Sequence, residues 1–220
     1  SLAKGKSRAT NLLNSEDVIS CLNCLKKLGI KIKFNKKFCE ITGKGLNGYN
    51  YKNNLTLHAG NSGTTARLLM AALVKSKKTI KITGDKSLNK RDMGRVIEPL
   101  QKFGVKFTGN KKNLPVFLKG TNSLKPINYK ELKGSAQCKS AVMIAALNTK
   151  GKTKLECLPS RNHSELMFKN VLKIPIKIKK NKKFDIIELI DWRCASRTSR
   201  GTACAQGAAC QGRVPGGSRP

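Results

Sequence analysis

One pattern occurs three times along this chain, and it constrains the fold more than any other feature. A short basic strand followed by an amphipathic helix begins near Ser7, again near Thr79 and again near Thr153, at spacings of 72 and 74 residues. The second and third copies follow a Gly/Ser-rich turn and an apolar helix, whereas only residues 1–3 precede the first copy. Self-similarity at a fixed period indicates repeated structural units. We therefore expect three units of one kind, the first without its first turn and helix.

The second copy shows what each unit contains. Residues 79–83 predict a strand that ends at a Gly/Asp turn. Apolar residues then recur at helical spacing on one face and predict a helix over 93–103, which Gly104 ends. Two further strands are expected at 105–108 and 114–118, joined by a Gly-Asn-Lys-Lys turn.

The helices after the two Gly/Ser-rich turns differ in kind, because they are apolar almost all round. They cover residues 60–73 and 134–147. A helix without a polar face lies in a protein interior. We predict an α/β (α+β) fold of repeated units, with inner buried helices packed together and with sheets and outer helices around them. This domain should cover residues 1–190. Residues 191–220 lose the hydrophobic periodicity and are expected to be an unrelated or disordered tail.

The chain is strongly basic, with 45 Lys and Arg against 12 Asp and Glu and a formal net charge of +33. This balance fits a nucleic-acid partner, small phosphorylated ligands, or a lysine-biased composition without a binding role. Many lysines fall in short loops, where they would be solvated. Aromatic residues make up 5% of the chain, and we find no helix-turn-helix, zinc-finger or base-stacking signature. We therefore expect small anionic partners and no nucleic acid.

The cysteines do not suggest a metal site. Cys21 and Cys24 have metal-like spacing, but they lie in an amphipathic run, and no second pair or histidine has matching spacing. We expect buried thiols, no metal and no cofactor. The sequence contains no recognisable signal peptide, and its apolar runs are short for a membrane span. We therefore expect a reducing, cytoplasmic setting without membrane association.

The turn before the first apolar helix has the composition of an anion site. Asn61 and Thr64 are of the types that cap helices, and Gly63 permits a tight turn with exposed backbone N–H groups. Such a helix N-terminus attracts phosphate or carboxylate. Arg67 places a cation near the positive end of the helix dipole and therefore needs an anionic partner. That partner is either a carboxylate of a neighbouring unit or a ligand.

The turn before the second apolar helix repeats this arrangement. Ser135 can cap the helix, Gln137 offers a neutral amide, and Lys139 again puts positive charge at a positive helix end. A capped helix with a lysine that reaches solvent is the alternative interpretation. Two equivalent turns built alike favour an anion site. Arg91 and Arg161 lie at the starts of the expected outer helices, where a solvated arginine and a ligand contact both fit.

Groups for proton transfer are harder to find. We see no Ser/His/Asp arrangement at a recognisable spacing and no carboxylate pair near the two turns. The sequence therefore predicts a place to hold phosphates and carboxylates without a complete acid–base set. We assign no catalytic residue within the chain.

Four motifs make the chain similar to the EPSP synthase family, the 3-phosphoshikimate 1-carboxyvinyltransferases. They are GNSGTTAR at 60–67, KRDMGRVIEPL at 90–100, GSAQCKS at 134–140 and SRNHSE at 160–165. The last two resemble the bacterial class with reduced glyphosate sensitivity. The resemblance covers roughly the first half of a family member. It implies an enolpyruvyl transferase-like fold of two domains, each with three βαβαββ units, which agrees with the period.

The resemblance also implies roles for individual residues. Shikimate 3-phosphate would be held by four residues: Ser135, Ala136, Gln137 and Arg161. Phosphoenolpyruvate would contact three: Gly63, Arg91 and Gln137. Four more would support the anion site: Asn61, Thr64, Arg67 and Lys139.

The implied reaction belongs to the shikimate pathway of aromatic amino acid biosynthesis. It adds the 5-hydroxyl of shikimate 3-phosphate to C2 of phosphoenolpyruvate and then releases phosphate. The family's Lys-Ser…Arg segment and its second domain, which supplies acidic catalytic residues, are not found in this sequence, so we expect the chain alone to be inactive. The full-length enzyme is expected to be a monomer. Gly63 leaves room for the inhibitor glyphosate, whereas the class resemblance favours partial tolerance.

Two other functions remain as alternatives. The transferases that act on UDP-N-acetylglucosamine share the fold and the enolpyruvyl chemistry, but they lack the pairing of the two turn motifs. A basic nucleic-acid-binding module would instead bind with a strong dependence on salt. Thermal protection by shikimate 3-phosphate or by a UDP-sugar distinguishes the two transferases. Nucleic-acid binding that weakens strongly with salt would identify the binding module.

Overall fold

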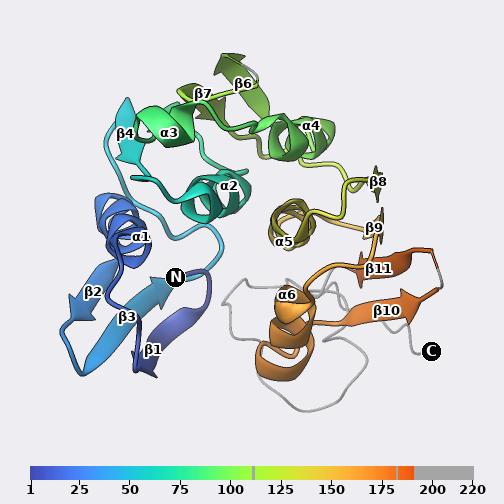
Figure 1. The fold of residues 1–220 in the computed structure, drawn as a ribbon, viewed down its shortest axis with the longest axis horizontal. Coiled ribbons are helices and arrows are strands. Elements are labelled where there is room, and N and C mark those ends of the chain that lie inside the picture. The colour runs from blue at the N-terminus through green and yellow to red at the C-terminus, as the bar shows by residue number, and fades with distance from the viewer. Residues whose placement is uncertain (111, 182, 191–220) are drawn as a thin grey trace, which may run out of the picture.

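The computed structural model describes residues 1–110, 112–181 and 183–190, so the expected tail at 191–220 lies outside the described residues. Helices and three sheets follow one another as three groups (Figure 1). The first group contains β1 (Lys4–Thr10), α1 (Glu16–Lys27), β2 (Lys31–Phe34) and β3 (Phe38–Lys44). The second contains β4 (Leu55–His58), α2 (Gly63–Ala72), β5 (Ile80–Thr83), α3 (Lys86–Asn89), α4 (Gly94–Lys102), β6 (Lys106–Gly109) and β7 (Val116–Lys119). The third contains β8 (Asn128–Glu131), α5 (Ala136–Ala146), β9 (Lys152–Cys157), α6 (His163–Leu166), the π-helical turn η1 (Met167–Val171), β10 (Ile176–Lys180) and β11 (Asp185–Ile190).

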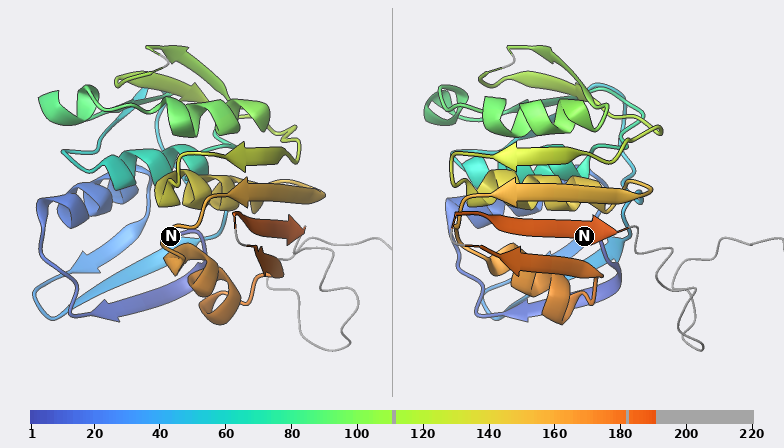
Figure 2. Two further views of the ribbon diagram at one scale, coloured as in Figure 1. Left: turned by 45° about the vertical axis from the view of Figure 1, so that its right-hand side comes forward. Right: turned by 90° about the vertical axis from the view of Figure 1, so that its right-hand side faces the viewer.

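The second and third sheets have the same topology. In the second sheet β4 pairs in parallel with β5, β5 pairs antiparallel with β7, and β6 lies beside β7. In the third sheet β8, β9, β11 and β10 take the same places. Figure 2 shows these four strands side by side with helices behind them. In the first sheet β1, β3 and β2 match the last three strands of the others. The predicted α/β fold of repeated βαβαββ units is confirmed.

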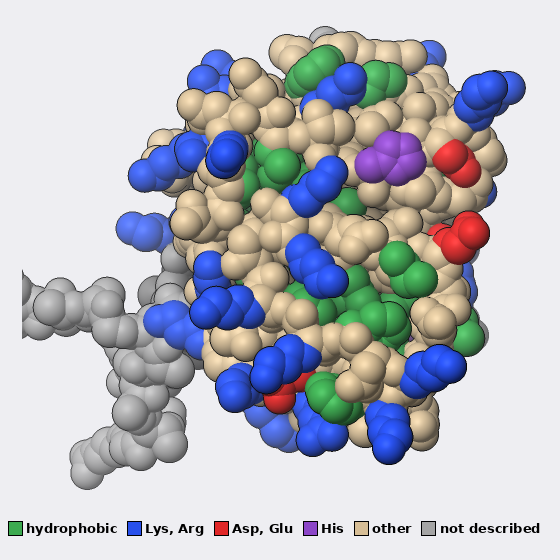
Figure 3. Space-filling view, turned by 90° about the vertical axis from the view of Figure 1, so that its left-hand side faces the viewer, with side chains coloured by type: hydrophobic (Ala, Val, Ile, Leu, Met, Phe, Trp, Pro, Cys, Tyr) green, Lys and Arg blue, Asp and Glu red, His purple; other side chains and the backbone are tan. Residues whose placement is uncertain are grey.

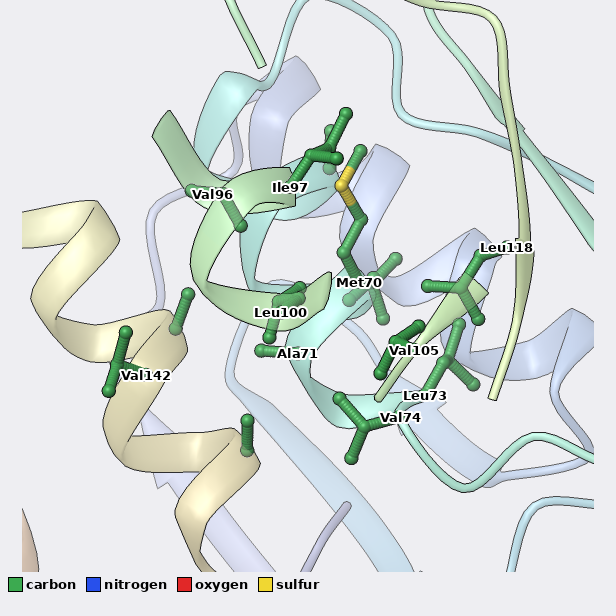
Figure 4. Close-up of a cluster of buried hydrophobic side chains, with 14 of the residues drawn as sticks. Met70, Ala71, Leu73, Val74, Val96, Ile97, Leu100, Val105, Leu118 and Val142 are labelled. Carbon is green, nitrogen blue, oxygen red and sulfur yellow. The ribbon is translucent and has the colours of Figure 1, made fainter. Parts of the chain in front are cut away.

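The inner helices form the centre of the molecule. Helices α2 and α5 pack against each other, and α4 packs on both. Figure 4 shows part of the cluster, in which Met70 of α2, Leu100 of α4 and Val142 of α5 are fully buried. Burying one side chain of this kind contributes about 1.5–3 kcal/mol. Because protein surrounds these two helices, they can be apolar almost all round, as predicted.

Local signals set most element boundaries. Helix α2 begins at Gly63, after the N-cap residue Ser62, whose hydroxyl accepts a backbone N–H of the first turn. Gly104 follows α4 with a φ of +103°, which side chains disfavour, and it ends that segment as predicted. Strand β7 begins at Val116 and not at 114, because Pro115 has no amide hydrogen to donate to the sheet.

Two features of the units were not predicted from the residue pattern. Strands β4 and β8 each contain only four residues and directly precede the Gly/Ser-rich turns. The outer helix of the third unit is also irregular, since α6 passes into the π-helical turn η1. These strands matter for function, because their ends fix where the two Gly/Ser-rich turns begin.

The described residues also bear on the other predictions. Cys24 is buried and its thiol donates to the carbonyl oxygen of His58 at 3.4 Å, while Cys21 is half-buried. Over the described ranges, no three His, Cys, Asp or Glu side chains are grouped as a metal would require. Likewise, none of the helices described combines the length and apolar character of a membrane span. Lys and Arg side chains are spread over the face shown in Figure 3 and do not gather in one patch.

Candidate functional site

Two helix N-termini meet at one place on the molecule. Helices α2 and α5 lie side by side, and Gln137 in the first turn of α5 links their starts. Its amide oxygen accepts a hydrogen bond from Arg67 Nη1 at 2.6 Å, and its amide nitrogen donates to Thr64 Oγ1 at 2.7 Å. Three residues assigned from the two separate motifs are therefore brought together.

The two turns are built in the same way. Gly60 and Gly134 have φ values of +60° and +62°, in the left-handed region where a side chain is strained. Ser62 and Ser135 then cap α2 and α5, each accepting the backbone N–H three residues on. The remaining N–H groups of each first turn form a positive helix end, which favours a bound anion.

Arg67 is the cation between the two turns. Its Nη1 bonds to the amide of Gln137, and its Nη2 bonds to the backbone carbonyl oxygen of Asp92 at 2.8 Å. Both acceptors are neutral, and within the described part of the chain no carboxylate lies within ion-pair distance of this guanidinium. Burial lowers the pKa of Arg67, and the nearby charges of Arg95 and Arg91 lower it further, while Asp92 opposes them. The carboxylate partner considered from the sequence is not found there, so the site has excess positive charge.

Arg91 stands at the edge of the same turn. Its Nη2 donates to Asn61 Oδ1 at 2.6 Å, and Asn61 Nδ2 in turn donates to Asp85 Oδ2 at 2.7 Å. Asp85 also caps α3 by accepting the backbone N–H of Leu88 at 2.6 Å. That N–H, followed by the Asn61 amide, holds the pKa of Asp85 below its ordinary value. Asn61 therefore spaces the ionised carboxylate from Arg91, which is exposed and available to a ligand.

An open pocket of about 470 Å³ lies beside the start of α5. Residues 134–137 and 159–161 line it. It contains all four residues that the resemblance assigned to shikimate 3-phosphate, with Arg161 exposed at its rim. Ser135 Oγ accepts from the backbone N–H of Cys138 at 3.2 Å, so its hydroxyl hydrogen can point to a ligand.

Ser160 was not assigned a role from the sequence. Its hydroxyl oxygen is buried and has no hydrogen-bond partner among the described residues, and the residue lines the pocket. A buried hydroxyl without a partner is unfavourable, so a polar group of a ligand would satisfy it. Its position directly before Arg161 in the SRNHSE motif is the signal that could have identified it.

Lys139 lies in the protein interior and does not reach solvent at the start of α5. Its side chain is 1% exposed, and Nζ lies 2.6 Å from Glu165 Oε1, which is itself 4% exposed. The ammonium group is therefore committed to an ion pair with α6, and the interpretation as a lysine reaching solvent is wrong. Because α5 is enclosed by protein, a long side chain at this position stays inside.

Repeated βαβαββ units with two paired helix starts and uncompensated arginines define an α/β protein suited to holding anions. A family model described as EPSP synthase (3-phosphoshikimate 1-carboxyvinyltransferase) matches residues 1–188. The chain is 44% identical over 169 residues to the 3-phosphoshikimate 1-carboxyvinyltransferase of Thermoanaerobacter sp. (strain X514), covering 76% of this chain and 40% of that protein. It is 42% identical over 184 residues to the protein of that name from Ruthia magnifica subsp. Calyptogena magnifica, covering 83% and 42%. The chain belongs to the EPSP synthase family.

A solved structure agrees with this assignment. EPSP synthase from Acinetobacter baumannii superposes with a TM-score of 0.75 at 32% identity, over 86% of this chain and 42% of that chain. The predicted family and its fold are therefore confirmed. The chain spans about two-fifths of the length of these relatives.

Proposed function

We propose that this chain provides the anion-holding part of an enzyme that transfers the enolpyruvyl group of phosphoenolpyruvate to the 5-hydroxyl of shikimate 3-phosphate. The observation that supports it most directly is Arg67, a half-buried cation with neutral partners between two helix starts. Names of relatives with 40–44% identity point to the same reaction. No cofactor and no metal is part of the proposal.

The pocket beside α5 would take shikimate 3-phosphate. Arg161 supplies a charged donor to the phosphate, Ser135 a hydroxyl, and the N–H groups of Ala136 and Gln137 the positive helix end. The hydroxyl of Ser160 would donate or accept a hydrogen bond at the pocket wall. A phosphorylated ligand fits this set because phosphate oxygens accept hydrogen bonds from donors of all these kinds.

Phosphoenolpyruvate would lie between the two turns, against Gly63, Arg91 and Gln137. Gly63 keeps space open there, because a Cβ at this position would lie 2.8 Å from Arg67 Nη1. Arg91 donates to Asn61 and the amide nitrogen of Gln137 donates to Thr64, both neutral acceptors, so an incoming carboxylate or phosphate offers the two donors a better acceptor. Glyphosate, an anion of similar size, is proposed to compete for this space.

The chemistry then follows from two anions held close together. The 5-hydroxyl gives up its proton as its oxygen adds to C2 of phosphoenolpyruvate, and C3 takes up a proton to become a methyl group. The tetrahedral intermediate then loses phosphate from C2 and a proton from that methyl group, which restores the double bond. Two multiply charged substrates repel each other, and preorganised cations offset that repulsion while fixing the reacting atoms in line. We propose that Arg67, Arg91 and Arg161 do this.

The carboxylates near the site are engaged elsewhere. Asp85 caps α3, Asp92 accepts the N–H of Gly94, and Glu165 pairs with Lys139. Glu131 accepts two backbone N–H groups. We therefore assign proton transfer to no carboxylate of the described residues and propose that the 220-residue chain alone is inactive. We further propose a cytoplasmic, monomeric full-length enzyme, as the family resemblance implies.

Calorimetric titration of the chain with shikimate 3-phosphate tests the proposal. We expect saturable binding that Arg161→Ala abolishes and that Arg8→Ala, an arginine stacked on Phe38 in the first unit, leaves unchanged. A folded chain that fails to bind would contradict the proposal. So would stronger thermal protection by a UDP-sugar, or tight DNA binding whose affinity falls steeply with salt.

A further inference from the structure

Glu131 is a buried carboxylate that contacts the segment leading into the wall of the pocket beside α5. It is the last residue of β8 and is 3% exposed. Its Oε1 accepts the backbone N–H of Lys133 at 3.0 Å, and its Oε2 accepts the backbone N–H of Ser135 at 3.0 Å. Both oxygens are thus bonded to the short segment that leads into the pocket wall. Hydrogen bonds to an ionised acceptor are roughly twice as strong as neutral ones.

These two bonds hold Ser135 and the segment directly before it. Its N–H is held by Glu131, and its hydroxyl oxygen is held by the N–H of Cys138. With both groups engaged, the remaining hydroxyl hydrogen and the following N–H groups of Ala136 and Gln137 have a defined direction. The geometry of the pocket wall therefore depends on the carboxylate.

The second unit has a weaker version of the same contact. His58 is the last residue of β4, and its Nδ1 accepts the backbone N–H of Gly60 at 3.2 Å. This is the equivalent position, two residues beyond the strand, but only one N–H is held and the acceptor is an imidazole nitrogen. Of the two Gly/Ser-rich turns, both of which the structure describes, the turn of the third unit is the one held by a carboxylate through two hydrogen bonds.

We propose that Glu131 is a positioning residue for the shikimate 3-phosphate pocket, which holds the Lys133–Ser135 segment so that Ser135 and the start of α5 face the ligand. The inference rests on the proposed function. A negative charge close to an anion pocket repels the ligand, so its electrostatic effect on affinity is unfavourable. Its favourable effect must come from geometry, and the two effects have opposite signs when the charge is removed.

The sign of the change in affinity therefore separates the two roles. Glu131→Gln keeps the shape of the side chain, removes the charge and turns an N–H donor towards one backbone N–H. If positioning dominates, shikimate 3-phosphate binds about tenfold more weakly to this variant, because a charge-assisted hydrogen bond is lost. If the carboxylate acts only through its charge, shikimate 3-phosphate binds more tightly to this variant than to the unaltered chain. Glu188→Gln, which removes a carboxylate paired with Lys152 in the same sheet, is the control and should leave affinity unchanged.

Amide hydrogen exchange followed by NMR tests the contact without a ligand. In the unaltered chain the N–H groups of Lys133 and Ser135 should be protected. In Glu131→Gln and Glu131→Leu both should exchange at least about tenfold faster, while the amides of β9 keep their rates. Unprotected amides in the unaltered chain would overturn the inference, and so would unchanged or tighter ligand binding by a folded Glu131→Gln. Failure of the unaltered chain to bind shikimate 3-phosphate would instead contradict the proposed function, while the exchange rates still show whether Glu131 holds the turn.

Discussion

The buried ion pair between Lys139 and Glu165 provides a sharp test of how this fold is held together. The two side chains are 1% and 4% exposed, and Nζ lies 2.6 Å from Oε1. Glu165→Gln keeps the shape of the side chain and leaves a buried ammonium group without its carboxylate. The two residues join the inner helix α5 to the outer helix α6, so the penalty should appear as global destabilisation.

The size of the penalty follows from the burial of the pair. Removing one partner of a buried pair costs about 3–5 kcal/mol, because the other charge stays buried and uncompensated. We therefore expect a loss of about 3–5 kcal/mol in the free energy of unfolding. For a domain of about 150–250 residues this lowers the melting temperature by roughly 6–20 °C.

Urea unfolding at pH 7 measures this loss, and the chain supplies its own control. Glu98 pairs with Lys102 at 3.3 Å, but these side chains are 60% and 52% exposed. Glu98→Gln should therefore cost less than about 1 kcal/mol. Replacing both Lys139 and Glu165 by Met should recover most of the loss, because neither charge remains. A penalty for Glu165→Gln as small as that of Glu98→Gln would refute the reasoning.

Two further predictions concern the site and the core. Gly63→Ala places a Cβ 2.8 Å from Arg67 Nη1 and 3.6 Å from Arg91 Nη1, so we expect weaker binding of phosphoenolpyruvate and glyphosate, with shikimate 3-phosphate affinity unchanged in parallel titrations. Burial, followed by the charges of Glu131 and Glu98, raises the pKa of Cys138 to about 12 from an ordinary 9.0. The stability that this thiol contributes is complete below pH 9.0 and is lost as pH rises towards 12. Cys138→Ala should flatten the fall in unfolding free energy over that window, and an unchanged slope would contradict the assignment.

The repeated fold could be predicted because its signals are local and occur more than once. The helix periodicity over 93–103, the glycine at 104 and the apolar character of 60–73 and 134–147 each correspond to an element of the structure. Strands β4 and β8 were missed, although they are as long as strand β5, which was predicted. Their place in the sheets depends on parallel pairing with β5 and β9, about 25 residues further on, and a local pattern does not record that pairing.

The site could be predicted only in part, for a similar reason. The capped turns at Ser62 and Ser135 are local and were recognisable from residue types. The partners of Arg67 were not, because Gln137 is 70 residues away and meets it only when α2 packs on α5. The buried pairing of Lys139 likewise depends on the place of α6. Glu131 had a recognisable signal, a carboxylate three residues before the glycine of a Gly/Ser turn, and that signal was overlooked.

The net charge of +33 contributes less to this site than the number suggests. On the face shown in Figure 3 the cations are scattered over exposed positions, where salt and water screen them within about 10 Å. Arg67 differs because it is half-buried and has neutral partners, so its charge is screened less and acts on whatever binds beside it. Affinity for a doubly charged phosphate should therefore depend steeply on Arg67 and only weakly on any lysine of the exposed strands. A nucleic-acid-binding surface would require the reverse, with many exposed cations each contributing a similar share.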